Sequence, residues 1–449
     1  MDQILYQYEM HPTTWVYLSS LLTVALFFKF NRVFSVRNLD LLGLIALAPG
    51  LLMVAQGTHL GAEGAGVVQV GYVWLFVVGG LFLARLLLDP MMIRRPLLEP
   101  NLSIGGLTFL AVCLLVFLTA NVVTAELTES DLDGPRRLDM LLGRQAAPPG
   151  EENSLARHGP GYPLLHVLPS IPGKLWRGGE ETLAPEEARQ RSWAVTAKTA
   201  AIMSHLAIVI GLVLIGYRHF DNLKTGLAVA TLYLLLPYTA QMTGRVDHVL
   251  PAALLVWAVE AYRRPLISGA LLGLAIGVIY YPLFLLPLWI AFYWQRGVWR
   301  FTLGVAAMLA LLVLSLIPTS ADAAMFFEQV KLMFGWPSLM LQHVDGFWSA
   351  DWAPYIYLVL AVFAAMSCGL AFFPARKNLG TLLSCSAAVM LGTQFWQPQG
   401  GGLFMAWYLP CLMLTVFRPN LEDRLAISSL GQSWLEKRRL QLRRGDKAA

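Results

Sequence analysis

Long runs of apolar residues, separated by short polar or proline- and glycine-containing gaps, follow one another along most of this chain. A run of about 20 apolar residues is long enough to cross a bilayer as a helix. The pattern therefore predicts an all-α polytopic membrane protein with about thirteen transmembrane helices. The expected spans are roughly 14–29, 39–56, 70–88, 103–124, 198–217, 225–242, 247–262, 265–280, 282–295, 300–318, 353–373, 379–395 and 402–417.

Lysine and arginine occur at every second boundary between these runs, and the other boundaries are poor in them or mixed in sign. Cytoplasmic loops of membrane proteins retain positive charge, so the alternation indicates which side each loop faces. We expect the N-terminus outside and the C-terminus in the cytoplasm. The positive boundaries are Lys29, Arg32 and Arg37; Arg94 and Arg95; Arg218 and Lys224; Arg263 and Arg264; Arg296 and Arg300; and Arg376 and Lys377.

Two of the expected outer loops are long, residues 125–197 and 319–352. Long loops are where function concentrates in compact proteins. In the first loop, charged segments alternate with Pro/Gly turns, which predicts short amphipathic helices along the outer membrane surface. The chain is accordingly divided into extra N-terminal helices in 1–102, a membrane core in 103–417 that includes both loops, and a basic cytoplasmic tail in 418–449.

Composition narrows the class of function. The 449 residues are 57% hydrophobic and only 14% charged, which excludes an ordinary soluble protein. The net charge of +5 is spread over loop boundaries and the tail, so we expect no nucleic-acid partner. The four cysteines lie inside apolar runs without C-x-x-C spacing, which predicts neither a disulfide nor a zinc site. Because no nucleotide-binding motif occurs, the energy for a reaction would come most simply from an activated substrate in the membrane.

Acidic residues gather at the start of the first outer loop, where Glu126, Glu129, Asp131 and Asp133 occur close together. A carboxylate shielded by a folded loop can act as a general base on an incoming hydroxyl. Asp133 precedes Pro135 by two positions, which also suits a helix N-cap with proline in the first turn. Asp133 therefore has both a structural and a catalytic interpretation, whereas Asp131 has less structural reason to be there.

A second polar cluster is expected at the outer end of two consecutive spans, where Gln241, Arg245, Asp247 and His248 occur. An arginine there can bind a phosphate through paired hydrogen bonds, while Asp247 orients it or binds a sugar hydroxyl. The alternative is that Arg245 and Asp247 merely close a short loop beside lipid headgroups. The spacing of these residues leaves both interpretations open.

The second outer loop places His343 and Asp345 among aromatic residues. Aromatic rings beside acids can hold sugar faces or lipid headgroups, although Trp and Tyr also form ordinary belts at membrane interfaces. His343 is the candidate for contact with a phosphate. Tyr281, at a Tyr-Tyr-Pro elbow, is expected on the same side of the membrane as Arg245 and is a candidate for lining a cavity.

The order of elements in residues 243–289 resembles a known family. The sequence G-R-V-D-H, a span, and then R-R-P-L-I-S-G-A-L-L-G-L-A-I-G-V-I-Y-Y-P is similar to the alpha-mannosyltransferase-like branch of the C-class glycosyltransferases, which use polyprenyl-phosphate sugars. A second, weaker likeness is G-Y-P-L at 161–164, which looks like the Tyr-Pro-Pro-Leu element of that family's first outer loop. The second proline is missing here. In this chain the loop follows the fourth span rather than the first, so three N-terminal spans depart from the family pattern.

The resemblance implies a C-class glycosyltransferase fold whose active site faces the outside of the plasma (inner) membrane. The implied reaction transfers a sugar, such as mannose or a relative, from polyprenyl phosphate to a lipid or glycan acceptor with inversion. No cofactor is expected, because cationic side chains can replace a metal at the leaving phosphate; the Asp131-Leu132-Asp133 sequence nevertheless spells D-x-D and keeps a divalent metal open. The implied roles are Asp131 or Asp133 as base, Arg245 and His343 at the donor phosphate, and Gln241, Asp247, His248, Tyr162, Tyr281 and Asp345 around the substrate cavity.

Two other functions compete with this one. A lipid or solute transporter predicts charged or broken spans near the middle of the membrane. A non-catalytic membrane assembly subunit predicts that Asp131, Asp133 and Arg245 point away from one another. The relative placement of these three side chains therefore separates the last hypothesis from the others.

Overall fold

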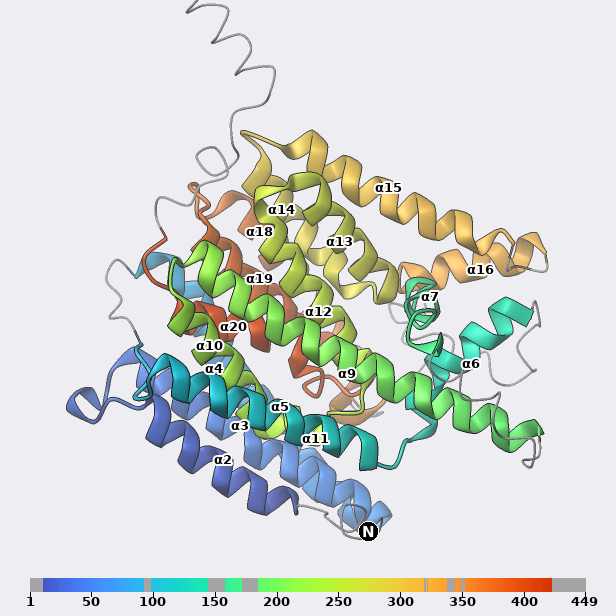
Figure 1. Ribbon diagram of the computed structural model, residues 1–449. Helices are drawn as coiled ribbons and strands as arrows, with labels where there is room; N and C mark the ends of the chain where they lie inside the picture. The colour runs from blue at the N-terminus through green and yellow to red at the C-terminus, as the bar shows by residue number, and fades with distance from the viewer. Residues whose placement is uncertain are drawn as a thin grey trace, which may run out of the picture.

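All regular secondary structure in the described part of the chain is helical, as expected. The computed structural model describes residues 11–92, 98–143, 158–171, 185–318, 320, 322–336, 344–348 and 352–421. Most of the helices lie side by side with their axes roughly aligned, so that they form one bundle (Figure 1). Every apolar run that the sequence analysis picked out falls on a helical element of this bundle.

Only some of these helices have the length of a membrane span. In the described ranges, seven helical segments are long and apolar enough to cross a membrane, which supports a membrane-embedded protein without establishing thirteen spans. The seven are α3 (Val36–His59), Gly61–Met91 around α4 (Ala65–Leu88), α5 (Ile104–Thr124), Glu186–His219 within α9 (Pro185–His219), α15 (Val298–Leu316), Ala353–Phe372 around α18 (Ile356–Phe372), and α19 (Leu379–Trp396).

The other expected spans are shorter helices, several of them interrupted by proline. Pro237 separates α10 from the short α11, because proline lacks an N–H and restricts the residue before it. Every residue of α20 is buried, and so is every residue of α10 from Thr225 onward. Their apolar character therefore serves contact with protein rather than with lipid. The shorter helices at the other expected spans are α2 (Pro12–Phe27), α10 (Leu223–Leu235), α11 (Pro237–Gln241), α12 (Val246–Glu260), α13 (Pro265–Val278), α14 (Leu286–Tyr293) and α20 (Leu409–Phe417).

The first outer loop folds at one end of the bundle (Figure 1). It contains α6 (Glu129–Gly143) and α7 (Gly161–Leu165), so the expected short helices are present. Within the range expected for this loop, α9 begins at Pro185, and its first turns extend beyond the bundle alongside α6 (Figure 1). Trp193 of this extension donates a hydrogen bond of 2.6 Å to Asp139 of α6. In the second loop, α16 (Ala323–Met333) lies beside α15 near the same end (Figure 1).

A buried ion network lies at the end of the bundle where α5 begins, and it joins α3 and the end of α4 to the residue that follows α20. Arg85 of α4 donates two hydrogen bonds of 3.1 Å to Asp40 of α3 and one of 2.8 Å to Asp89. Arg418, which follows α20, donates to Asp89 at 2.5 Å, and Arg37 donates to the Arg418 carbonyl at 3.2 Å. The helices in residues 1–102 are therefore fastened to the rest of the bundle rather than appended to it.

Replacing Asp89 by asparagine should destabilise the whole bundle. Asp89 is completely buried, and the substitution leaves the guanidinium groups of Arg85 and Arg418 without the charge that they share. Removing one partner from a buried ion pair costs about 3–5 kcal/mol of stability. The measurement is thermal unfolding of the detergent-solubilised protein, with Glu63→Gln at an exposed position as the control. Equal melting temperatures for the two variants would contradict a structural role for the network.

Candidate functional site

Two carboxylates from separate parts of the chain share one guanidinium where α6 and α12 begin. Arg245, the residue before α12, donates from Nε to Asp247 Oδ1 at 3.2 Å and from Nη2 to Asp247 Oδ2 at 2.9 Å. Its Nε also lies 3.3 Å from Asp131 Oδ1, an ion contact between the bundle and the first outer loop. Both carboxylates are buried, whereas Arg245 is 28% exposed. The sequence prediction thus places these three residues together correctly.

Asp131 is held in place by the start of its own helix. The backbone N–H and the hydroxyl of Thr128 donate to Asp131 Oδ2 at 2.9 Å and 2.7 Å, and the Asp131 N–H donates to the Thr128 carbonyl at 2.9 Å. The bond from the Thr128 N–H to the Asp131 side chain is one half of a capping box, whereas the Asp131 N–H bonds the Thr128 carbonyl rather than its hydroxyl. Burial raises the pKa of Asp131, and the hydrogen bonds from Thr128 and the charge of Arg245 only partly offset that effect. One oxygen is fixed by Thr128 while the other faces Arg245.

Asp133 has a different role from the N-cap that its spacing suggested. That prediction is wrong, because α6 begins at Glu129 and Pro135 lies inside the helix. Asp133 accepts hydrogen bonds from Arg137, one turn further on, with contacts of 3.1 Å and 3.0 Å, and His158 lies 3.6 Å away. Burial on its own would raise the pKa of Asp133, but the contact with His158 and the charge of Arg137 outweigh it and lower the pKa. Asp133 is therefore a weaker base than Asp131.

Tyr162 is packed between two histidines on the α7 side of the site. Its ring stacks on His158 with centroids 4.1 Å apart and meets the edge of His166 at 4.8 Å. The rings fit because Gly134 of α6 has no side chain: a Cβ there would lie 2.5 Å from His166 and 2.9 Å from Tyr162. Tyr162 is completely buried, and its hydroxyl has no hydrogen-bond partner among the described residues.

The back of the site is formed by His248 and by residues far away in sequence. His248 Nε2 lies 4.0 Å from Asp247 Oδ2, and its Nδ1 shares a 2.6 Å hydrogen bond with the hydroxyl of Tyr238. Its ring stacks on Phe404 with centroids 4.3 Å apart, and Trp407 donates to the Asp247 carbonyl at 3.3 Å. The sequence analysis missed Tyr238, Phe404 and Trp407, because such long-range contacts leave no spacing signal.

The structure also describes three other candidate site residues, Tyr281, Gln241 and Asp345. Tyr281 is near it, since its ring centroid lies 5.1 Å from that of Trp407. Gln241 ends α11, and its amide nitrogen is buried without a hydrogen-bond partner among the described residues. Asp345 donates its N–H to the carbonyl of Pro398 at 2.7 Å, and none of its described contacts joins it to Arg245. His343 lies outside the described residues.

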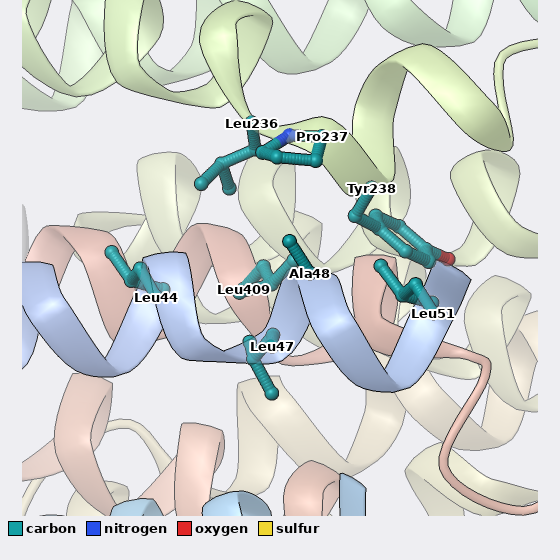
Figure 2. Close-up of a pocket in the computed structure, with 8 residues that line it drawn as sticks. All are labelled: Leu44, Leu47, Ala48, Leu51, Leu236, Pro237, Tyr238 and Leu409. Atoms are coloured by element: carbon teal, nitrogen blue, oxygen red, sulfur yellow. The ribbon is translucent and has the colours of Figure 1, made fainter. Parts of the chain in front are cut away.

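One cavity among the described helices is lined largely by residues outside this cluster (Figure 2). It lies where α3, the break between α10 and α11, and the start of α20 meet, and its lining carries no charged side chain. Tyr238 connects the two places, because its ring lines the cavity and its hydroxyl binds His248. At the cluster itself, the side chains of Asp131 and Arg245 contact each other. The lining residues are Leu44, Leu47, Ala48, Leu51, Leu236, Pro237, Tyr238 and Leu409.

The two acids of the D-x-D sequence face different arginines. Asp131 faces Arg245, and Asp133 faces Arg137. Within the described ranges, no group of three or more His, Cys, Asp or Glu side chains is arranged to hold a metal ion. The acids of this sequence are therefore ion-pair partners in this structure.

Comparisons of the chain with models of protein families, with curated proteins and with solved structures found no match. The family resemblance therefore depends on the short elements in residues 159–165 and 243–289.

Replacing Gly134 by alanine should displace Tyr162 and loosen the first outer loop. The added Cβ would overlap His166 and Tyr162, and overpacking of this kind costs about 1–3 kcal/mol. Gly105→Ala is the matched control, because a Cβ at that helical position meets nothing within 4 Å and alanine favours a helix. We expect Gly134→Ala to speed hydrogen exchange and proteolysis in α6 and α7. Exchange as slow as in the Gly105→Ala protein would show that this close packing does not hold the loop.

Proposed function

We propose that this protein is an integral-membrane glycosyltransferase that moves a sugar from a polyprenyl-phosphate donor to an acceptor hydroxyl outside the cytoplasm. The observation that carries the proposal is the contact between Asp131 of the first outer loop and Arg245 at the start of α12, with Asp247 on the other side. A general base and a cation for a leaving phosphate would lie side by side there. The competing hypothesis of a non-catalytic assembly subunit predicts that these groups point away from one another.

Asp131 is the proposed base. As the acceptor oxygen attacks the anomeric carbon, its proton passes to Asp131. The bond between that carbon and the phosphate oxygen breaks, the phosphate leaves with the electron pair, and the anomeric configuration is inverted. The raised pKa supports this role, because a carboxylate is a stronger base when its pKa is closer to the working pH.

Arg245 is proposed to contact both the base, Asp131, and the phosphate of the sugar donor. Asp247 fixes the plane of its guanidinium group through two hydrogen bonds, and Nε faces Asp131. Its Nη1 has no hydrogen-bond partner among the described residues, and the side chain is partly exposed. That edge can bind the donor phosphate as negative charge develops on it. Arg245 would then position the base with one edge and stabilise the leaving group with the other.

The site is proposed to face the outside of the plasma (inner) membrane, with the N-terminus also outside and the C-terminus in the cytoplasm. Arg218, Arg263 and Arg264 support this orientation, because they lie at the end of the bundle opposite the site. Arg218, at the end of α9, binds Glu260 at the end of α12 at 2.6 Å, and Arg263 and Arg264 form the turn into α13. Cytoplasmic ends of spans are the ones that carry such residues.

Transfer from a polyprenyl-phosphate sugar should depend on Asp131. The assay offers purified protein radiolabelled polyprenyl-phosphate mannose together with candidate lipid and glycan acceptors. Loss of a general base lowers the rate by about 100- to 10,000-fold, so Asp131→Asn should fall by that factor. Asp322→Asn is the control, because Asp322 is exposed at the start of α16 and asparagine caps a helix equally well. Undiminished transfer by Asp131→Asn would remove the proposed base.

The pH dependence of the rate should report the surroundings of Asp131. A base must be ionised, so kcat/KM should fall as the pH drops through the pKa of Asp131, at a pH above the ordinary value of about 3.9. Thr128 and Arg245 lower this pKa, while Asp247 raises it. Arg245→Met and Thr128→Val should therefore each move the acid limb to higher pH. An acid limb that neither variant moves would belong to a different group.

A further inference from the structure

The hydroxyl of Tyr162 has a place in the site but no partner there. The side chain is completely buried, and the oxygen has no hydrogen-bond partner among the described residues. Leaving a buried polar group unsatisfied costs about 1–3 kcal/mol, so native proteins seldom do it without a reason. A phenylalanine would fill the same space without that cost. The hydroxyl is therefore explained best by an acceptor that arrives with a ligand.

The packing around Tyr162 fixes the direction in which its hydroxyl points. The ring is held between His158 and His166 and lies against the backbone of α6 at Gly134. The segment that carries it is fixed to the end of α13, where the Gly159 N–H donates to the Val278 carbonyl at 3.0 Å. The hydroxyl of Tyr162 is thus positioned before any ligand binds. Such preorganisation favours selective recognition.

The charges around Tyr162 indicate the chemistry of that ligand. Three carboxylates act on the hydroxyl, those of Asp131, Asp133 and Asp247. Only two guanidinium groups oppose them, Arg245 and Arg137, so the Asp and Arg side chains leave one negative charge in excess. These acids would repel an anionic ligand. A neutral sugar suits them, because its hydroxyls donate to carboxylates and accept from a phenol.

We infer that Tyr162 forms a sugar subsite, in which its hydroxyl donates a hydrogen bond to one oxygen of the sugar ring or its hydroxyls. The donor phosphate then lies on the exposed edge of Arg245, and the sugar lies towards Tyr162. This inference rests on the proposed function and adds to it a residue that determines which sugar is accepted. Burial keeps the pKa of Tyr162 well above its ordinary value, so the phenol stays a hydrogen-bond donor throughout the working pH range.

The test pairs Tyr162→Phe with donors that lack single hydroxyls. Farnesyl-phosphate mannose and its singly deoxygenated forms are the probes, and kcat/KM is measured with the wild-type protein and the variant. Losing one hydrogen bond to a substrate hydroxyl corresponds to roughly a 5- to 150-fold loss in kcat/KM. We expect that loss for Tyr162→Phe with the complete donor. We also expect a comparable loss for the wild type with one particular deoxy donor, and no further loss when the two changes are combined.

A matched control and a stability measurement separate recognition from structure. Tyr217→Phe, at an exposed position near the far end of α9, should transfer at the wild-type rate. Tyr162→Phe should melt at the same temperature as the wild type or higher, because it removes an unsatisfied buried group. A lower melting temperature would mean that the hydroxyl already has a structural partner, which would overturn the inference.

The remaining outcomes are equally distinct. If Tyr162→Phe keeps the wild-type kcat/KM with every donor, or if its loss adds fully to that of each deoxy donor, Tyr162 does not contact the sugar. The proposed glycosyltransferase activity would survive either result, because the wild type still transfers. If the wild type transfers from no donor to any acceptor, the proposed function fails and the sugar subsite fails with it.

Discussion

The contact between Arg245 and Asp131 is the interaction on which the arrangement of the outer end depends. A carboxylate cannot be buried alone without a large penalty, so α6 can dock on the bundle only where a cation is offered. Arg245 offers it because Asp247 holds the guanidinium group in position, and Trp407 in turn contacts the backbone of Asp247. With the start of α6 fixed in this way, the packing of α7 against Gly134 follows. This ion contact therefore acts together with the Gly159–Val278 and Trp193–Asp139 hydrogen bonds to join the loop to the helices.

The helices could be predicted from apolar runs, but their relation to the membrane could not. In α19, 94% of the most apolar window is buried inside the protein, compared with 22% in α15, although both have the length and hydropathy of a span. Hydropathy measures the preference for leaving water and does not distinguish lipid from a protein interior. For the same reason the fully buried α10 and α20 looked like spans, and the polar first turns of α9 looked like loop.

The site was predictable where its residues are close in sequence and where a family pattern supplied the rest. Arg245 and Asp247 lie two positions apart, while the partnership with Asp131 came only from the resemblance and is present in the structure. Asp133 was misread because Pro135 was taken to mark the first turn of a helix that begins earlier. His158, Tyr162 and His166 are close in sequence and their rings contact one another in the structure, but only Tyr162 lies within α7.

The buried ion network at the other end of the bundle bears on the order in which the protein is made. Asp40, Arg85 and Asp89 lie on helices that leave the ribosome early, and Arg37 of α3 belongs to the same buried network. Arg418, which also binds Asp89, follows it by 329 residues. Chains are synthesised from the N-terminus and their early parts begin to fold first. The contact between Asp89 and Arg418 can therefore form only after α20 has been made, so the early helices are fastened to the rest of the bundle late in synthesis.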